Sequence, residues 1–600
     1  MRAIILAAGY GNRMRPVTDT VHKTMLRVGD RTILEHIVDA LLANQVTKIL
    51  LVTGYRADDL RACIAARYPE LDVQFVHNAR YRETNNIVST ALAFEHVPPD
   101  EDVLLIESDL VCDPEILRRI IACPEPDVAL LDRYRTGMDG TVVTVEEGIV
   151  TSVIPPHLQT GEFTFRDKYK TLNIYKFSRE FIGSAFRELL SWYCRTIDQS
   201  VYYELILGVL IYMKRARIHA LVLDGERWAE LDDPNDLRAA EFTFNKGARR
   251  EILESTKGGF WSFDVLDFAY IRNVHFPTPA ILSELRSNLP VLIQNYGSAQ
   301  PVLDRKLAYL LLADERRVRA LSGLSQLYPF LRARYEGRRV LVPTPTFGEY
   351  DRAFPNARRY EDAPAQGRPV TIASLTEAMT DEEVVVVVNP NNPTGTVLPT
   401  DELFALARRR PDRQFIVDES FLDFSDETSL QSRLEREPLE NLLLVKSLSK
   451  CLGIPGLRLG YAYSCDPSLI ADIGAFLPIW SLNSVVEHFL EIVLKHRTSL
   501  AESFARTRRD RLDLATRLTA AGHTAHPSGA NFLLATLERP RSHADALTAS
   551  LIERERIYVK DVSDRIGDGR SHLRIAVRLP EEHARLLAAM SAFERESGAQ

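Results

Sequence analysis

Short apolar runs alternate along the chain with segments in which apolar residues recur every three or four positions. The first pattern predicts buried strands, and the second predicts helices with one buried face. In the first half we expect strands at 1–8, 48–54 and 102–109, with helices at 32–44 and 114–123. In the second half we expect strands at 338–345, 383–390, 413–420, 441–449 and 457–464. Such alternation is typical of doubly wound sheets, so both halves are predicted to be α/β.

The alternation weakens between the two halves, around Gly258 and Gly259. One hydrophobic core rarely grows past about 250–300 residues, so a chain of 600 residues implies at least two domains. We therefore predict one domain at 1–243, a linker at 244–262 and a second domain at 263–600. The two halves carry different motifs, which argues against an internal duplication.

Composition narrows the class of protein. Hydrophobic residues make up 45% and charged residues 26% of the chain, which is usual for a globular protein and excludes a fibrous or disordered one. No apolar run approaches the roughly 18 residues of a membrane helix, and the N-terminus predicts a buried strand rather than a signal peptide. The net charge of -8, with both signs interspersed, does not favour nucleic acid as a partner. Six scattered cysteines suit neither a disulfide framework nor a zinc site, so we expect a reduced, cytoplasmic protein.

A glycine-rich loop follows the first predicted strand. Gly9 and Gly11 let the backbone approach a phosphate, and Arg13 and Lys23 would add positive charge. Taken alone, this loop fits a tight strand-to-helix turn almost as well. It is accompanied by Asn85-Asn86-Ile87 with Ser89, by Glu107-Ser108-Asp109, and by Trp228-Ala229-Glu230-Leu231-Asp232.

Together these motifs resemble the sugar-phosphate and cholinephosphate nucleotidyltransferases over nearly all of 1–243. His22 stands where the usual motif has proline before the lysine, which favours the cholinephosphate cytidylyltransferase branch over the sugar branch. The resemblance implies a nucleotide pocket formed by Leu6, Ala8, Gly9, Gly11 and Asn85. It also implies that Lys23 contacts the transferring phosphate and Arg13 the leaving pyrophosphate.

Three carboxylates are the candidate Mg²⁺ ligands of this domain. Asp109 ends a buried strand, and Glu230 and Asp232 lie two apart, so on a strand they share one face. The alternative is that Glu230 and Asp232 are solvent-exposed residues at the edge of a sheet. Lys170 and Asn173 are candidates for the acceptor pocket, with a plain structural strand as an equally weighted alternative.

The second half carries another set of spaced motifs. Asn389–Gly395 follows a run of five valines, Asp418 ends the next strand, and Ser447-Leu448-Ser449-Lys450 precedes Arg458 by eight residues. Over about 263–600 this set resembles the class I/II, fold-type I enzymes that use pyridoxal phosphate (PLP). Histidinol-phosphate aminotransferase and threonine-phosphate decarboxylase are the most similar subgroups.

The resemblance assigns a role to each matching position. Lys450 would form the Schiff base, Asp418 would pair with the pyridine nitrogen, and Asn392 would bond the ring hydroxyl. Phe347 would stack on the ring. The cofactor phosphate would be held by Ser325, Gln326, Ser447, Ser449 and Arg458. Arg574 would bind the substrate carboxylate, with Arg578 as a second anion contact.

One departure from the aminotransferase pattern is informative. These enzymes usually place a tyrosine three residues after the aspartate, where this chain has Phe421, as threonine-phosphate decarboxylase does. We therefore favour decarboxylation of a phosphorus-bearing amino acid over transamination.

Combined, the halves resemble bifunctional enzymes of phosphonate biosynthesis. The second half would convert 2-amino-4-phosphonobutyrate to 3-aminopropylphosphonate, and the first would transfer CMP from CTP to that aminoalkylphosphonate. One alternative is a 2-aminoethylphosphonate transaminase joined to its cytidylyltransferase. In a second alternative, the first half is a cholinephosphate-type enzyme with an unrelated PLP partner. In a third, the second half is a catalytically silent dimerisation module, but the presence of Lys450 and Asp418 argues against this. By resemblance we expect a homodimer.

Overall fold

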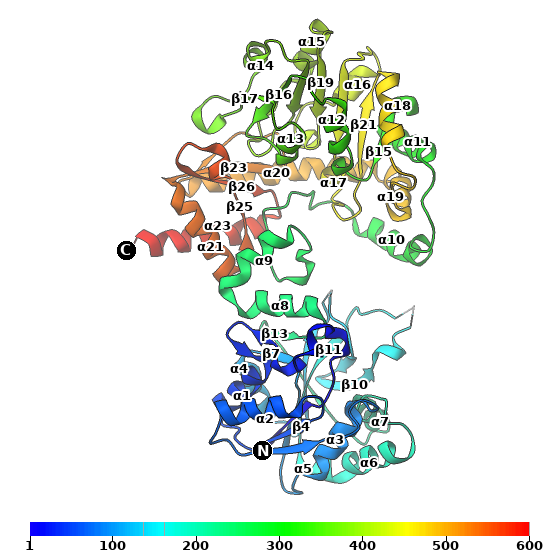
Figure 1. The fold of residues 1–600 in the computed structure, drawn as a ribbon, viewed down its shortest axis with the longest axis vertical. Coiled ribbons are helices and arrows are strands. Elements are labelled where there is room, and N and C mark those ends of the chain that lie inside the picture. Colours follow the sequence, from blue (N-terminus) through cyan, green and yellow to red (C-terminus); the bar gives the residue numbers. More distant parts are fainter. Residues whose placement is uncertain (136, 161–162, 599–600) are drawn as a thin grey trace. The chain divides into compact units, whose positions relative to one another are not determined.

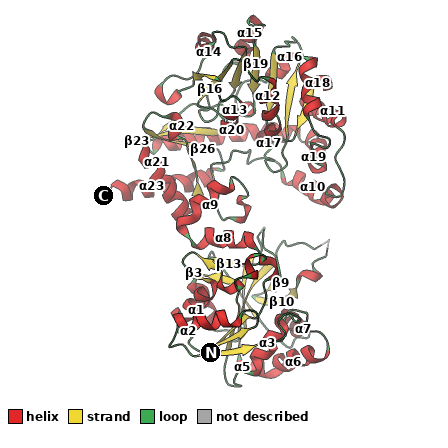
Figure 2. Cartoon of the chain, in the orientation of Figure 1, coloured by secondary structure: helices red, strands yellow, loops and turns green. Residues whose placement is uncertain are grey.

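The computed structural model describes residues 1–135, 137–160 and 163–598. The chain divides into two compact units, Met1–Asp264 and Val265–Gln600, each with its own sheet and its own core (Figure 1). In both units the strands lie between helices (Figure 2). The predicted α/β class with mixed sheets is confirmed. Within the described ranges, no helix combines the length and apolarity needed to cross a membrane.

The first unit is built on a nine-stranded mixed sheet with the strand order β5-β4-β1-β6-β11-β8-β12-β10-β9. Its strands are β1 (Arg2–Ala7), β4 (Ile49–Thr53), β5 (Val73–His77), β6 (Val103–Glu107), β8 (Val128–Arg133), β9 (Val142–Glu146), β10 (Ile149–Ile154), β11 (Tyr169–Phe177) and β12 (His219–Val222). Its longer helices are α1 (Ile33–Ala43), α2 (Ala57–Arg67), α3 (Asn86–Glu95), α4 (Pro114–Ala122), α6 (Arg187–Thr196), α7 (Glu204–Tyr212), α8 (Pro234–Phe244) and α9 (Arg249–Thr256).

Strand β1 shows why the first apolar run is continuous. Ala3 and Ile5 pack into the core on one face of the sheet, whereas Ile4 and Leu6 pack into the core on the other. Since successive side chains of a strand point to opposite faces, a strand covered on both sides must be apolar throughout. Helix α1 begins where predicted, because Thr32 and Glu35 form a reciprocal capping box at its N-terminus.

Strand β11 is irregular at its centre. Its register against β8 shifts between Thr171 and Tyr175, and Asn173 within that shift has a left-handed φ of 56°. Such a bulge re-aims the side chains of the strand.

The segment 244–262, expected to be a linker, contains helix α9 and packs as part of the first unit. Ile252 and Leu253 of this helix are buried, and Phe263 packs against Phe242 of α8. The chain passes from one compact unit to the other at Asp264 and Val265.

The second unit has a seven-stranded sheet with the order β15-β21-β20-β19-β18-β16-β17. These strands are β15 (Val318–Leu321), β16 (Val340–Thr344), β17 (Arg358–Glu361), β18 (Val384–Val388), β19 (Gln414–Asp418), β20 (Leu442–Lys446) and β21 (Gly460–Ser464). A smaller sheet follows, in the order β22 (Thr524–Ala525), β23 (Phe532–Pro540), β26 (Arg570–Ala576) and β25 (Lys560–Asp561). The main helices are α10 (Pro279–Leu292), α11 (Gln300–Leu311), α12 (Tyr328–Arg334), α13 (Gly348–Ala353), α15 (Thr400–Arg409), α17 (Leu448–Cys451), α18 (Pro467–Phe476), α19 (Ser484–Leu494), α20 (Arg497–Ala520), α21 (Arg541–Glu555) and α23 (Pro580–Gly598).

Strands β18, β19 and β20 are parallel neighbours, so their carboxyl ends meet at one edge of the sheet. The predicted motifs follow those ends: Asn392 comes after β18, Asp418 closes β19, and Ser447 and Lys450 come after β20.

Candidate active sites

The glycine loop of the first unit opens into two adjoining cavities of about 170 and 690 Å³. Gly11 has φ 70°, and a Cβ there would lie only 3.2 Å from Cβ of Lys23, so the loop needs glycine at this position. The smaller cavity is lined by residues predicted to hold the nucleotide, namely Leu6, Ala8, Gly9, Gly11, Lys23 and Asn85. The larger one is lined by Gly9, Gly11, Arg13, Lys23, Asn85, Asp109, Lys170, Asn173, Glu230 and Asp232. All the residues predicted for the first domain therefore line one or both cavities.

Lys23 lies between two of the predicted metal ligands. Its Nζ is 2.8 Å from Oδ2 of Asp109 and 3.0 Å from Oδ1 of Asp232. Strand pairing brings these aspartates together, because β13 (Trp228–Glu230) runs antiparallel to β7 (Leu110–Cys112). Although burial opposes the charge, the two carboxylates hold the pKa of Lys23 above its ordinary value, so the amine is a fixed cation in the cavity.

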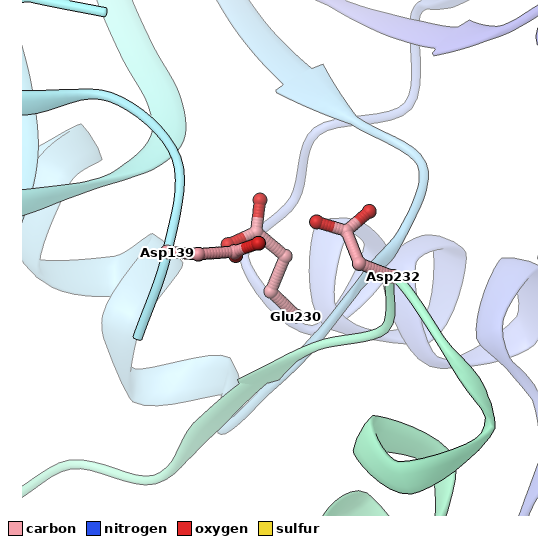
Figure 3. A group of neighbouring side chains, drawn as sticks. All are labelled: Asp139, Glu230 and Asp232. Atoms are coloured by element: carbon pink, nitrogen blue, oxygen red, sulfur yellow. The ribbon is translucent and has the colours of Figure 1, made fainter. Parts of the chain in front are cut away.

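A second group of carboxylates faces one point in the larger cavity. Oxygen atoms of Asp139, Glu230 and Asp232 lie within 4.8 Å of one another, and Figure 3 shows them converging. Asp139 was not predicted, because it lies in an irregular loop with no motif around it. Asp109 is not part of this three-residue group, but its buried Oδ1 has no hydrogen-bond partner among the described residues. The unpartnered Oδ1 of Asp109 and the converging oxygens of the three other carboxylates are of the hard-oxygen type that Mg²⁺ requires.

Lys170 and Asn173 both reach Glu230. Nζ of Lys170 is 2.9 Å from Oε2 of Glu230, and Nδ2 of Asn173 donates to Oε1 at 3.2 Å. In a regular strand, residues three apart point to opposite faces, so the bulge at Asn173 is what brings both side chains to the same carboxylate. Burial raises the pKa of Glu230 to about 7, despite the opposing charge of Lys170.

The larger cavity also contains residues that sequence reasoning did not select. Glu204 and Tyr202 belong to this group, and Asn86 and Glu107 had been noted only as parts of motifs. Glu204 could have been found, since it is the only charged residue at the start of the apolar segment ELILGVLIY. Burial raises the pKa of Glu204 to about 7.

The second unit holds a cavity of about 370 Å³ at the carboxyl edge of its sheet. Its walls include most of the predicted cofactor and substrate residues, namely Ser325, Phe347, Asn392, Asp418, Ser447, Lys450, Arg458 and Arg574. Phe421 also lines it and packs edge-on against Phe532, with 5.2 Å between the ring centres.

Asp418 is fixed by hydrogen bonds to both carboxylate oxygens. Tyr350 donates its hydroxyl to Oδ2 at 2.9 Å, and Ser420 donates its backbone N–H to Oδ1 at 2.9 Å. Tyr350 was not predicted, because no motif marks it. A buried carboxylate held this rigidly is suited to a cationic ring nitrogen, which is what PLP presents.

Two arginines and the catalytic candidate Lys450 share this cavity. Burial, and then the charges of Arg574 and Arg458, lower the pKa of Lys450 to about 8. Arg458 donates to Oγ of Ser325 at 3.1 Å, and Arg574 donates to Oδ1 of Asn392 at 2.9 Å. Nε of Arg574 is buried without a partner among the described residues. An amine with a lowered pKa, two anion-binding guanidinium groups and the anchored Asp418 together fit PLP.

Three predicted residues of the second unit lie outside the lining of this cavity. Ser449 is fully buried, and its hydroxyl is bonded to the backbone of Leu459. Gln326 accepts a hydrogen bond from the backbone of Ser322. Arg578 pairs with Glu582. In the structure each of these side chains contacts a neighbour in the fold, and its predicted contact with the ligand stays a prediction.

Comparison with known proteins identifies both units. Residues 3–168 match the MobA-like NTP transferase domain, and residues 275–590 match aminotransferase class I and II. Over 601 aligned residues the chain is 33% identical to CMP-5'-(3-aminopropyl)phosphonate synthase of Streptomyces rubellomurinus, covering 98% of this chain and 95% of that one. It is 26% identical to L-serine phosphate decarboxylase of Sulfurospirillum multivorans over 375 residues, or 59% of this chain and 94% of the relative.

A solved structure of a decarboxylase from Sulfurospirillum multivorans shares the fold of the second unit. It has a TM-score of 0.50 and 24% identity, and the match covers 57% of this chain and 91% of that one.

The fold, the cavities of both units and the matches define a two-domain enzyme that joins an NTP transferase to a PLP-dependent unit of the aminotransferase class. The chain belongs to the class I and II aminotransferase family and, over almost its whole length, to the family of CMP-5'-(3-aminopropyl)phosphonate synthase.

Proposed function

We propose that the second unit decarboxylates 2-amino-4-phosphonobutyrate to 3-aminopropylphosphonate, and that the first unit transfers CMP from CTP to this product. The observation that carries the proposal is the 33% identity to CMP-5'-(3-aminopropyl)phosphonate synthase across both units. The similarity of the second unit to L-serine phosphate decarboxylase supports decarboxylation of a phosphorus-bearing amino acid.

In the second unit, one CO₂ leaves for each proton taken up at the α-carbon. Bound PLP would supply an electron sink for the pair left behind when the carboxyl group departs. Asp418, anchored by Tyr350 and Ser420, would keep the ring nitrogen protonated. Lys450 would bind the cofactor and, because its pKa is near 8, could deliver the proton at neutral pH.

The proposed anion contacts divide between the two arginines of the cavity. Arg458, with Ser325 and Ser447, would hold the cofactor phosphate, and Arg574 would hold an anionic group of the substrate.

In the first unit, the phosphonate oxygen would attack the α-phosphorus of CTP, and pyrophosphate would leave. This chemistry asks the protein mainly to position the reactants and neutralise charge. Lys23 would contact the transferring phosphate and Arg13 the pyrophosphate. Mg²⁺ would be held by Asp232 and Glu230 with Asp109 or Asp139.

The test gives the purified enzyme 2-amino-4-phosphonobutyrate with PLP and Mg²⁺, and follows CO₂ and phosphorus NMR with and without CTP. The proposal requires CO₂ release, followed by a phosphonate–CMP signal when CTP is present. Absence of CO₂, with cytidylylation of added 2-aminoethylphosphonate, would instead assign transamination to the second unit. That alternative is favoured by the 24% identity to histidinol-phosphate aminotransferase of Staphylococcus epidermidis.

We further propose that the chain forms a homodimer. Tyr296 and Trp480 stack on each other with 4.5 Å between ring centres, yet their side chains are 80% and 51% exposed. Exposed stacked aromatic residues suit a protein interface better than they suit water. The mass in solution, measured by light scattering, tests this point, and a monomer at micromolar concentration would refute it.

A further inference from the structure

Glu204 is a buried carboxylate without a partner for one of its oxygens. It is the first residue of α7, its side chain borders the 690 Å³ cavity, and the residue is only 3% exposed. Its Oε2 makes no hydrogen bond within the described part of the chain. Burying an acceptor in this way is costly unless a ligand supplies the missing donor.

Glu107 lines the same cavity and is linked through Asn86 to Tyr203, the residue before Glu204. Nδ2 of Asn86 donates to Oε1 of Glu107 at 3.0 Å, and Oδ1 of Asn86 accepts from the backbone N–H of Tyr203 at 3.0 Å. Strand β6 and helix α7, far apart in sequence, thus present two carboxylates to one space.

The cations lining the cavity are committed elsewhere. Lys23 pairs with Asp109 and Asp232, Arg13 pairs with Asp139 and Asp232, and Lys170 pairs with Glu230. Among the described residues, neither Glu107 nor Glu204 has an ion pair. The convergent carboxylates suited to a metal ion are Asp139, Glu230 and Asp232, and these two glutamates are not among them.

An ammonium group fits these two carboxylates better than a metal ion does. It brings a positive charge and several N–H donors, and two carboxylates that have no ion pair among the described residues can pair with that charge and accept those N–H groups. A metal ion would need further oxygen ligands converging with them.

We propose that Glu204, together with Glu107, binds the primary ammonium of the acceptor during cytidylyl transfer. This inference rests on the proposed function and adds the basis of its specificity: the first unit selects an amine at the far end of the phosphonate. In this proposal the phosphonate end faces Lys23, and the amine end faces the start of α7.

The test compares 3-aminopropylphosphonate with butylphosphonate, in which a methyl group replaces the ammonium. Pyrophosphate release is followed with CTP and Mg²⁺ for the full-length wild type, for Glu204→Gln and for Glu107→Gln. Because a site built for a polar group rejects an analogue that lacks it, we expect wild type to favour the amine by more than about a hundredfold in kcat/KM. Each glutamine variant should lower that ratio at least tenfold, mainly through KM for the amine.

Glu188→Gln is the matched control, since Glu188 lies exposed on α6 in the same unit and should leave the ratio unchanged. Binding of CTP, measured by calorimetry, reports whether each variant is folded. If a variant does not bind CTP, the test rests on the kcat/KM ratio of wild type for the two phosphonates. Equal turnover of the two by wild type overturns the inference.

The outcomes separate this inference from the proposed function. Wild type that cytidylylates neither phosphonate contradicts the proposed function itself. Wild type that cytidylylates the amine, with folded variants that keep its full preference for the amine, leaves the proposed function standing and overturns the role of Glu204 and Glu107.

Discussion

The lowered pKa of Lys450 predicts how fast PLP attaches at each pH. With an ordinary lysine pKa of 10.5, about 0.03% of the amine is neutral at pH 7, whereas a pKa of about 8 makes about 9% neutral. The difference is about 300-fold in reactive amine, or about 3 kcal/mol in the free energy of protonation. The causes are burial of Lys450 and the positive charges of Arg574 and Arg458.

The perturbation is Arg574→Gln, which removes the larger of the two cationic contributions. Apo-enzyme is mixed with PLP in a stopped-flow instrument between pH 6 and 10, and attachment is followed by visible absorbance. In wild type the rate should rise tenfold per pH unit and level off near pH 8. In the variant the plateau should begin at a higher pH, and a plateau that begins one pH unit higher would lower the rate at pH 7 about tenfold.

The position of the plateau is the decisive quantity, because loss of an anion contact would lower the rate equally at every pH. Arg332→Gln, at an exposed site on α12, is the matched control and should leave the plateau near pH 8. A free lysine derivative reacting with PLP shows the behaviour of an ordinary amine. A wild-type rate that keeps rising beyond pH 9.5, as for that free amine, would refute the reasoning.

Three further predictions concern the two units separately. Asp109→Asn removes a charge that holds Lys23, so pyrophosphate release should fall by about 10²–10³-fold while CO₂ release by the second unit is unchanged. Equal losses in the two activities would contradict the placing of Asp109 in the site of the first unit. Burial lowers the pKa of His583 to about 4, so the unfolded chain gains a proton that the folded one does not, and unfolding free energy should drop by about 3 kcal/mol as pH falls from 6.5 to 4. Urea titrations across that range should show a smaller drop in unfolding free energy for His583→Asn than for wild type. An equal drop in the two proteins would show that protonation of His583 is not its cause. Thr32→Ala breaks the capping box of α1 and should cost the first unit about 1 kcal/mol in urea unfolding, a loss that Thr32→Ser should largely avoid.

Much of the second site could be predicted because its residues follow the ends of parallel strands. Asp418 closes β19, and Asn392 and Lys450 follow within a few residues of the runs VVVVV and LLLVK, whose carboxyl ends meet at one edge. Ser449 shows the limit of this reasoning. It shares a motif with Ser447, but its hydroxyl is bonded to the backbone of Leu459, and it is not among the residues that line the cavity.

The first site was harder to complete from sequence, because its walls come from loops and distant helices. Glycine spacing placed Gly9, Gly11 and Lys23 together, since a phosphate-binding loop is local. Asp139 and Glu204 belong to segments far away in sequence, and only the folded chain brings them to the cavity. The segment 244–262 lacks strong periodicity, yet α9 is stabilised there by packing against α8, which a periodicity argument cannot detect.

The bulge at Asn173 makes the larger cavity of the first unit sensitive to the length of β11. Deleting one residue there would straighten β11 and turn Lys170 or Asn173 to the opposite face of the sheet, because side-chain direction alternates along a strand. Point substitutions in this pocket adjust individual contacts, whereas a single insertion or deletion in β11 would exchange a whole set of them. A change in the length of this strand should therefore change which groups line the cavity more strongly than a point substitution does.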